Sequence, residues 1–205
     1  MSAPDFAMTR YRRFLAVLAL LLSFIPARAV STVVIDAGHG GHDRGGGPGQ
    51  RIPEKPYVLD IAKRLSGVLQ NAGFRTVMTR SGDYFVGLGG RCDIANKQSN
   101  AIFVSVHLNS APRTGADGIE TYYYSSKSAG LAAAIHREVV RAAGTENRGV
   151  RRRGYYVLRN TRIPAVLCEC GFLTNPGEGA RISGSASHRQ RLAEAIGRAI
   201  IATYR

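Results

Sequence analysis

The chain has 205 residues, of which 44% are hydrophobic and 20% are charged, a composition that excludes a disordered protein and suits one sizeable globular core. Its formal net charge is +14 at pH 7, which favours polyanionic partners such as an acidic cell-wall polymer or an anionic membrane surface, unless the arginines merely solvate the surface. The three cysteines are too few to build a disulfide scaffold, and an odd number leaves at least one thiol free.

Residues 1–29 are typical of a secretory signal peptide. Arginines between residues 10 and 13 form a positive segment, and the apolar run from Phe14 to Pro26 follows it. Ala27 and Ala29 then place small residues where a signal peptidase reads. The apolar run is shorter than the roughly 20 residues of a membrane span, although an uncleaved anchor is the alternative. We therefore expect an exported protein of the periplasm or cell wall, with no nucleic acid as partner.

Short β-branched runs alternate with longer amphipathic patterns in the remaining chain. The patterns predict strands over residues 32–35, 74–79, 101–107, 118–124, 155–158 and 165–169. They predict helices over residues 55–71, 88–97, 129–143 and 187–202. This order predicts an α/β fold for residues 30–205: a single-domain three-layer sandwich whose mostly parallel, twisted sheet is covered by helices on both faces.

Four polar residues lie at the ends of these expected elements. His39 follows the first strand, His107 ends the strand that starts at residue 101, and Glu169 ends the last strand. Glu54 comes just before the first helix. Because the carboxyl ends of parallel strands meet at one edge of a sheet, we expect these side chains to lie close together.

Two histidines and one glutamate form a typical three-ligand set for a catalytic zinc ion, which keeps its fourth position open for water. The ion lowers the pKa of that water towards about 7. A further carboxylate that is not a ligand, here Glu169, can then take and pass on the proton. Taken singly, a histidine after a strand is more often structural, and a glutamate at a helix start is more often a surface charge.

The sequence around these residues strengthens the zinc interpretation. Gly38, Gly40 and Gly41 allow the backbone to turn tightly and to approach a ligand closely. Glu169 interrupts the otherwise apolar segment 164–172, where a buried carboxylate is costly unless it has a metal or a proton-transfer role.

Five sequence blocks carry a resemblance to one known family. The run VVIDAGHGGHDRGGGPG, followed by EKPYVLDIAKRL, resembles the zinc-dependent N-acetylmuramoyl-L-alanine amidases, the cell-wall family called amidase type 3. Further blocks resemble that family in the same order: TRSGDYFVGLGGRCDIAN, FVSVHLNS, GIETYYY and PAVLCECGFLTNPGE. The likeness extends from Val33 to about Ile200, which is nearly all of the chain after the leader.

The resemblance implies that His39, Glu54 and His107 hold one zinc ion per chain and that Glu169 is the catalytic glutamate. It implies hydrolysis of the amide between N-acetylmuramic acid and the L-alanine of the stem peptide in peptidoglycan, by a monomer, during cell-wall remodelling or daughter-cell separation. The alternatives are a zinc peptidase that cuts stem peptides and a non-catalytic peptidoglycan-binding protein. A thiol hydrolase using Cys168 or Cys170 is a further alternative, although no histidine is expected beside either cysteine.

Other residues have two open interpretations each. Arg80 and Arg91 are expected to form structural salt bridges rather than to contact substrate. Asn109 either orients substrate or shapes the loop after His107, and Asp36 either orients a ligand histidine or caps a turn.

The remaining candidates are expected to be structural or solvated. His42, His136 and His188 are expected at the surface, and Cys168 and Cys170 are expected in the core, facing away from Glu169. Residues 151–153, three arginines in a row, are expected in a solvated loop that could meet stem-peptide carboxylates.

Overall fold

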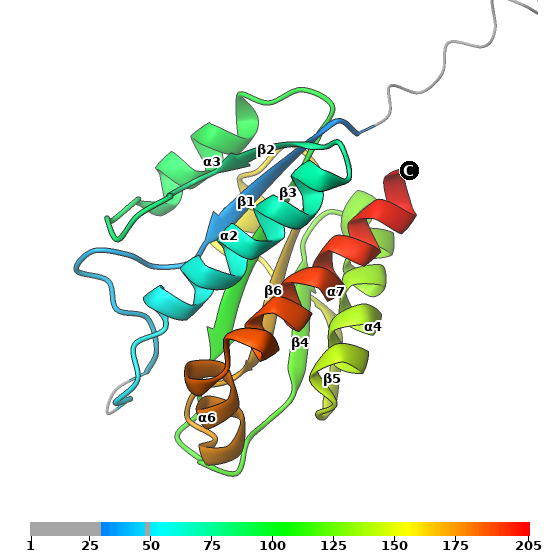
Figure 1. The fold of residues 1–205 in the computed structure, drawn as a ribbon. Helices are drawn as coiled ribbons and strands as arrows, with labels where there is room; N and C mark the ends of the chain where they lie inside the picture. Colours follow the sequence, from blue (N-terminus) through cyan, green and yellow to red (C-terminus); the bar gives the residue numbers. More distant parts are fainter. Residues whose placement is uncertain (1–29, 48–49) are drawn as a thin grey trace, which may run out of the picture.

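A computed structural model describes residues 30–47 and 50–205, so the leader expected over residues 1–29 lies outside the described residues. Six strands form one sheet in the order β2-β1-β3-β6-β4-β5, and helices cover it (Figure 1). The strands are β1 (Thr32–Ala37), β2 (Arg75–Met78), β3 (Ala101–Asn109), β4 (Ile119–Tyr123), β5 (Asn147–Arg152) and β6 (Ala165–Phe172). The helices are α2 (Lys55–Asn71), α3 (Leu88–Asn96), α4 (Ala129–Ala143), α5 (Tyr156–Arg159), α6 (Pro176–Gly184) and α7 (Ala186–Tyr204).

The predicted α/β fold with a mostly parallel sheet is confirmed. β1 pairs in parallel with β2 and β3, β3 pairs in parallel with β6, and β4 pairs in parallel with β5. β4 runs antiparallel to β6, so the sheet reverses direction at that single pairing. The carboxyl ends of β1, β3 and β6 consequently meet at the same edge.

Successive side chains of a strand point to opposite faces of the sheet. The strands therefore contribute to two hydrophobic cores, one on each face. The larger core contains Val33 and Ile35 of β1 together with α2, α4 and α7, which lie side by side over this face in Figure 1. The smaller core contains Val34, Phe103 and Leu167 together with residues of α3 and α5. Because both faces of β1 and β3 are covered, these strands read as continuous apolar runs.

Helix α2 begins and ends as the sequence predicts. Its buried residues Val58, Ile61, Leu65 and Leu69 recur at helical spacing on the face towards the sheet. Pro56 suits the first turn because it needs no backbone donor there. The start of this helix fixes Glu54, the residue just before it, at the carboxyl edge of the sheet.

The strand predicted over residues 155–158 is wrong, because these residues belong largely to the short helix α5. The structure instead has a strand that was not predicted, β5, over Asn147–Arg152. The sequence of β5, NRGVRR, has few apolar residues because β5 is an edge strand in which no residue is buried. Helix α6 was also not predicted, although Asn175 caps it by accepting hydrogen bonds from the N–H groups of Gly177 and Glu178.

No helix in the described part of the chain is both long and apolar enough to cross a membrane.

Candidate functional site

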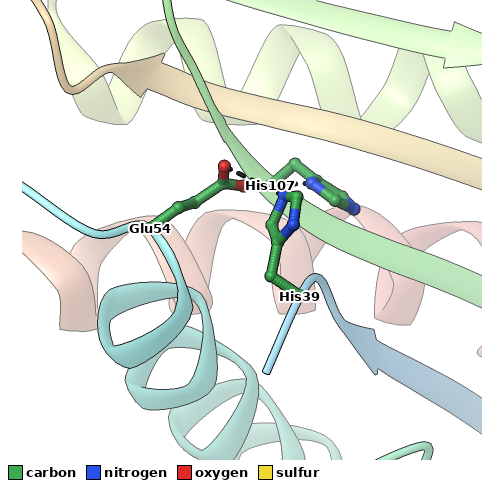
Figure 2. A group of neighbouring side chains, drawn as sticks. All are labelled: His39, Glu54 and His107. Carbon is green, nitrogen blue, oxygen red and sulfur yellow. Dashed lines mark hydrogen bonds and ion pairs between the residues drawn. The ribbon is translucent and has the colours of Figure 1, made fainter. Parts of the chain in front are cut away.

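The structure brings His39, Glu54 and His107 together at the carboxyl edge of the sheet, from three separate segments (Figure 2). His39 comes from the loop after β1, Glu54 from the start of α2, and His107 from β3. One ligand atom from each residue lies within 4.8 Å of the others. The sequence-based expectation of proximity is therefore met.

Glu54 joins the two histidines through its two carboxylate oxygens. Its Oε1 atom lies 3.0 Å from Nδ1 of His107, and its Oε2 atom lies 3.1 Å from Nε2 of His39. The two imidazole rings stand edge to face, with centroids 4.9 Å apart. The N–H of Leu108 also donates to Oε1 over 2.8 Å, which fixes the carboxylate against β3.

The local backbone explains why glycines surround His39. His39 has φ 60°, in the left-handed region that non-glycine residues rarely occupy. A Cβ atom on Gly38 would lie 2.3 Å from Cε1 of His107, so the imidazole occupies the space that any side chain at position 38 needs. A Cβ atom on Gly45 would likewise lie 2.7 Å from Cδ2 of His39. The glycine-rich loop thus lets three side chains converge.

The charges of the three residues are strongly interdependent. Burial raises the pKa of Glu54, but hydrogen bonds from His107 and His39 outweigh burial and lower that pKa to about 2. Burial lowers the pKa of His107, but the hydrogen bond to Glu54 outweighs it and raises that pKa to about 9. In the absence of a cation, protons on the imidazoles balance the Glu54 carboxylate. A divalent cation can take over this role by displacing those protons.

Asp43 holds the outer nitrogen of His39, a contact that the sequence analysis did not anticipate. Its Oδ2 atom lies 2.8 Å from Nδ1 of His39, and its Oδ1 atom accepts the N–H of Gly45 over 3.0 Å. Nε2 of His39 is consequently the nitrogen that faces Glu54. Histidines that bind metals commonly have such a carboxylate on their second ring nitrogen. A carboxylate four residues after the histidine was the sequence signal available.

Asp36 has a different role from either one expected. Its carboxylate is buried and accepts hydrogen bonds from Thr79 over 2.7 Å and from Ser105 over 2.6 Å, and it pairs with Arg91 over 2.7 Å. It therefore ties β1 to its neighbours beneath the site, without contacting a ligand histidine or capping a turn.

The two expected structural arginines behave differently. Arg91 forms the predicted salt bridge with Asp36, and it also donates to the carbonyl oxygen of His39 over 2.7 Å. Arg80 is fully buried and donates instead to carbonyl oxygens, including those of Ala37 and Gly38 at 3.0 and 2.8 Å. Both guanidinium groups shape the loop that carries His39.

Glu169 lies beside His107, because the two residues are register partners on adjacent strands. Its Oε2 atom is buried and has no hydrogen-bond partner among the described residues. Burial raises the pKa of Glu169 to about 7, although the nearby His107 lowers it in part. A carboxyl group with a pKa near neutrality is well suited to accept and donate a proton.

Asn109 supports a second carboxylate. Its Nδ2 atom donates to Glu120 over 2.8 Å, and Tyr122 donates its hydroxyl to the same carboxylate over 2.6 Å. Arg148 completes the cluster with a salt bridge to Glu120 of 3.2 Å. Glu120 is also the register partner of Glu169 across β4 and β6, so this cluster borders the proposed catalytic residue.

All four predicted site residues line one cavity of about 580 Å³. Asp43 and Asn109 line the same cavity, whereas Cys168 and Cys170 do not. Both cysteines are buried in the larger core, as predicted, and remain free. The cavity thus joins the candidate metal-ligand set and the buried carboxyl group of Glu169 in one space.

Two of the histidines expected at the surface are buried instead. His136 lies between Thr121 and Asn147, with ring-nitrogen distances of 3.1 and 2.7 Å, and so connects α4 to the sheet. His188 is buried in the first turns of α7. His42 is exposed as expected, with its ring 4.2 Å from that of Phe85.

The arginine run at residues 151–153 does not form the expected loop. Arg151 and Arg152 belong to the edge strand β5, and Arg152 donates to the carbonyl oxygen of Tyr124 over 2.8 Å. Arg151 lies 3.6 Å from a carboxylate oxygen of Glu120. The charges are exposed, but strand pairing fixes their backbone.

Comparisons with known proteins agree with the geometry. A family described as N-acetylmuramoyl-L-alanine amidase matches residues 33–202. A probable cell wall amidase, LytH of Staphylococcus epidermidis, is 38% identical over 168 residues, which cover 80% of this chain and 55% of LytH. The uncharacterized protein YqiI of Bacillus subtilis is 35% identical over 194 residues, covering 90% of this chain and 93% of YqiI.

A solved structure shares the fold as well. The N-acetylmuramoyl-L-alanine amidase AmiC2 of Nostoc punctiforme superposes with a TM-score of 0.79 at 38% identity, over 84% of this chain and 96% of the AmiC2 chain. The chain spans about half the length of LytH, the first curated relative it matches.

Proposed function

The chain belongs to the N-acetylmuramoyl-L-alanine amidase family, and we propose that it hydrolyses the amide between N-acetylmuramic acid and L-alanine in peptidoglycan. The observation that carries the proposal is the shared cavity: three metal-ligating side chains converge there beside a buried carboxyl group with a free oxygen. Hydrolysis of an unactivated amide needs both an electrophilic centre and a group that moves protons.

We infer that the electrophilic centre is one zinc ion held by His39, Glu54 and His107. The donor set fits this ion, because two imidazoles and one carboxylate are typical ligands of catalytic zinc and leave a position open. The burial of Glu54 between two histidines also fits, since a buried charge cluster of this kind is costly without a cation. When bound, zinc supplies Lewis acidity, which makes a water molecule acidic near neutral pH and polarises the substrate carbonyl.

The residues of this chain supply the remaining steps. Glu169 accepts the proton of the attacking water and then delivers it to the leaving nitrogen of L-alanine. Its raised pKa, about 7, suits both transfers near neutral pH. Asp43 keeps Nε2 of His39 directed into the site by binding Nδ1. Asn109 and Glu120 maintain the end of β3 next to the reacting centre.

We propose that this activity is exported to the periplasm or cell wall. Support comes from the leader pattern in residues 1–29 and from the relative LytH, which is named a probable cell wall amidase. Cell-wall remodelling and daughter-cell separation are the processes that such a reaction serves. The basic composition of the chain suits contact with anionic wall polymers.

The bond that is cut tests the proposal. Purified protein loaded with Zn²⁺ is incubated with peptidoglycan, and the products are analysed by mass spectrometry. We expect intact stem peptides with a free L-alanine amine, together with glycan strands that carry an unsubstituted lactyl carboxylate. Fragments cut inside the stem peptide would instead identify a zinc peptidase, and wall binding without any product would identify a binding protein.

The Glu169→Gln variant tests the proton-transfer role separately. It should retain zinc at one equivalent per chain and lose activity by a factor of about 10² to 10⁴, the usual contribution of a general acid–base group. Zinc content is measured by atomic emission on the same sample that is assayed. Undiminished turnover by this variant would remove Glu169 from the mechanism.

A further inference from the structure

Exposed apolar side chains gather at one side of the cavity. Large hydrophobic residues are exposed at five positions in the described ranges, and four of them line the cavity with the candidate metal site. These four, the aromatic wall, are Phe85, Leu88, Tyr155 and Tyr156, with exposed fractions between 43% and 54%. Single exposed apolar residues need no explanation, whereas a group beside a cavity indicates a binding surface.

The aromatic wall is built from two neighbouring segments on the same face of the sheet. Phe85 lies in the β2–α3 connection and Leu88 begins α3, while Tyr155 lies just before α5 and Tyr156 begins it. The segments lie close together, because a Cβ atom on Gly89 would stand 3.9 Å from the hydroxyl oxygen of Tyr156. The ring of Tyr155 stands edge-on to buried Tyr122, with centroids 5.0 Å apart, so its position is supported from beneath.

Outside the aromatic wall, the cavity lining combines charged and polar groups with apolar residues that are partly or fully buried, namely Val86, Leu108, Val157 and Leu167. Asp43, Glu54 and Glu169 carry carboxyl groups there, and Asn109 and Ser110 add uncharged polar groups. The lining residues include a single arginine, Arg91, and no lysine. The Arg91 guanidinium is already paired with buried Asp36. No free arginine or lysine therefore lines the cavity, and its most exposed apolar side chains are those of the aromatic wall.

We propose that the aromatic wall binds the glycan half of the substrate, with a sugar ring of the strand lying against Tyr155 and Tyr156. This inference rests on the proposed function, in which the reacting amide joins a glycan to a peptide. An N-acetylated sugar is uncharged, and it presents a C–H face and a methyl group edged by hydroxyls. Tyrosine matches this pattern, because its apolar ring carries a polar hydroxyl at one end. A stem peptide bears carboxylates, and no free arginine or lysine lines the cavity to pair with them.

Binding of peptide-free glycan tests the wall without any turnover. Oligomers of N-acetylglucosamine, which are N-acetylated sugars without a lactyl carboxylate and carry no charge, are titrated calorimetrically into the full zinc-loaded protein. Tyr155→Ala and Tyr156→Ala should each weaken binding about fivefold or more, since each removes a large apolar contact. Tyr84→Ala is the matched control, because Tyr84 is equally exposed, at 48%, and does not line the cavity. It should leave the dissociation constant unchanged.

Hydrolysis kinetics give a second readout that a general loss of structure would not produce. In the two tyrosine variants, the KM for an oligomeric glycan substrate should rise at least fivefold while kcat remains within about twofold. The KM for a minimal muramoyl dipeptide, which has one sugar, should rise much less. The proposal would be overturned if KM rose equally for both substrates. It would also be overturned if free stem peptide competed with glycan for binding to the aromatic wall.

These results separate the inference from the proposed function. If glycan binding depends on Tyr155 and Tyr156 but the protein cuts no amide, the aromatic wall binds glycan and the amidase activity is refuted. If the protein cuts the amide but both tyrosine variants bind glycan as tightly as wild type does, the amidase activity is supported and glycan binding by the aromatic wall is refuted.

Discussion

The side chains of Asp43 and His39 are joined by a contact of 2.8 Å between Oδ2 and Nδ1, which leaves Nε2 of His39 facing Glu54. Asp43 binds the ring nitrogen that faces away from Glu54, and it is not one of the three residues whose ligand atoms converge. Its effect is to select the ring nitrogen that is protonated and to fix the orientation of the ring.

Removal of this carboxylate should weaken zinc binding without unfolding the protein. We expect Asp43→Ala to lower zinc affinity by a factor of about 10 to 100, and Asp43→Asn to lower it less, because the amide oxygen can still accept from Nδ1. Zinc affinity is measured by competition with a chromophoric chelator. Asp93→Asn is the control, because Asp93 is exposed on α3. Equal zinc affinity in wild type and Asp43→Ala would show that the contact does not orient His39.

The parts of this site that follow strand ends were predictable from sequence. His39, His107 and Glu169 were expected at strand ends, and they do lie near the carboxyl edge, although β3 and β6 continue beyond His107 and Glu169 to Asn109 and Phe172. Short buried strands read clearly as apolar runs, and parallel strands bring their carboxyl ends together. Glu54 was found because the amphipathic pattern of α2 marks its own start. Each of these inferences depends on a regular element.

The parts that depend on loops and edges were not predictable. Asp43 lies in an irregular glycine-rich loop, whose path no periodic pattern reveals. β5 was missed because an exposed edge strand lacks the apolar alternation that marks its neighbours, and arginine predominates in it. The aromatic wall was missed as well, since Phe85 and Tyr155 are 70 positions apart in the chain and meet only around the cavity.

Asp36 should make folding stability depend on pH in the acid range. Burial raises the pKa of Asp36, but the Arg91 charge and hydrogen bonds from Ser105 and Thr79 outweigh it, so the pKa lies below the usual 3.8. A lowered folded-state pKa means that this stabilisation is complete above about pH 4 and is lost as the pH falls further. At pH 7, Asp36→Asn should cost about 3 to 5 kcal/mol, because it leaves Arg91 buried and unpaired.

Urea unfolding of metal-free protein at pH 7 and at pH 3 measures this effect. The difference in unfolding free energy between wild type and Asp36→Asn should be smaller at pH 3. Ser105→Ala is a milder second variant that should cost about 1 kcal/mol through one lost hydrogen bond. A difference that does not change between the two pH values would show that the Asp36 charge contributes nothing.

The thiols of Cys168 and Cys170 should play no part in catalysis. They lie 3.6 Å apart in the core, and the pKa of Cys170 is raised well above its usual value by its hydrogen bond with Cys168 and by burial. A protonated, buried thiol is a poor nucleophile. We expect Cys168→Ala and Cys170→Ala to retain most activity while each lowers stability by about 1 kcal/mol, near the value of one buried methylene group.

Alkylation provides the complementary measurement for these thiols. Iodoacetamide should react slowly with the native zinc-loaded protein and rapidly in urea, with no loss of activity in the native sample. Inactivation of native protein that keeps its zinc would instead revive a thiol mechanism.

A pair of glycines tests whether the crowding around the histidines is specific to the site. An alanine at position 38 places its Cβ atom 2.3 Å from Cε1 of His107, so the imidazole must leave its present position. An alanine at position 67, inside α2, meets nothing within 4 Å. We expect Gly38→Ala to lower zinc affinity and activity at least tenfold, because a displacement of this size breaks the ligand geometry. Gly67→Ala should leave zinc affinity unchanged and raise the free energy of unfolding by about 1 kcal/mol, since alanine has a higher helix propensity than glycine.

Chelator competition measures the zinc affinity of both variants, and thermal unfolding measures their stability. If Gly38→Ala binds zinc as tightly as Gly67→Ala does, His107 is not held in the position that the ligand set requires.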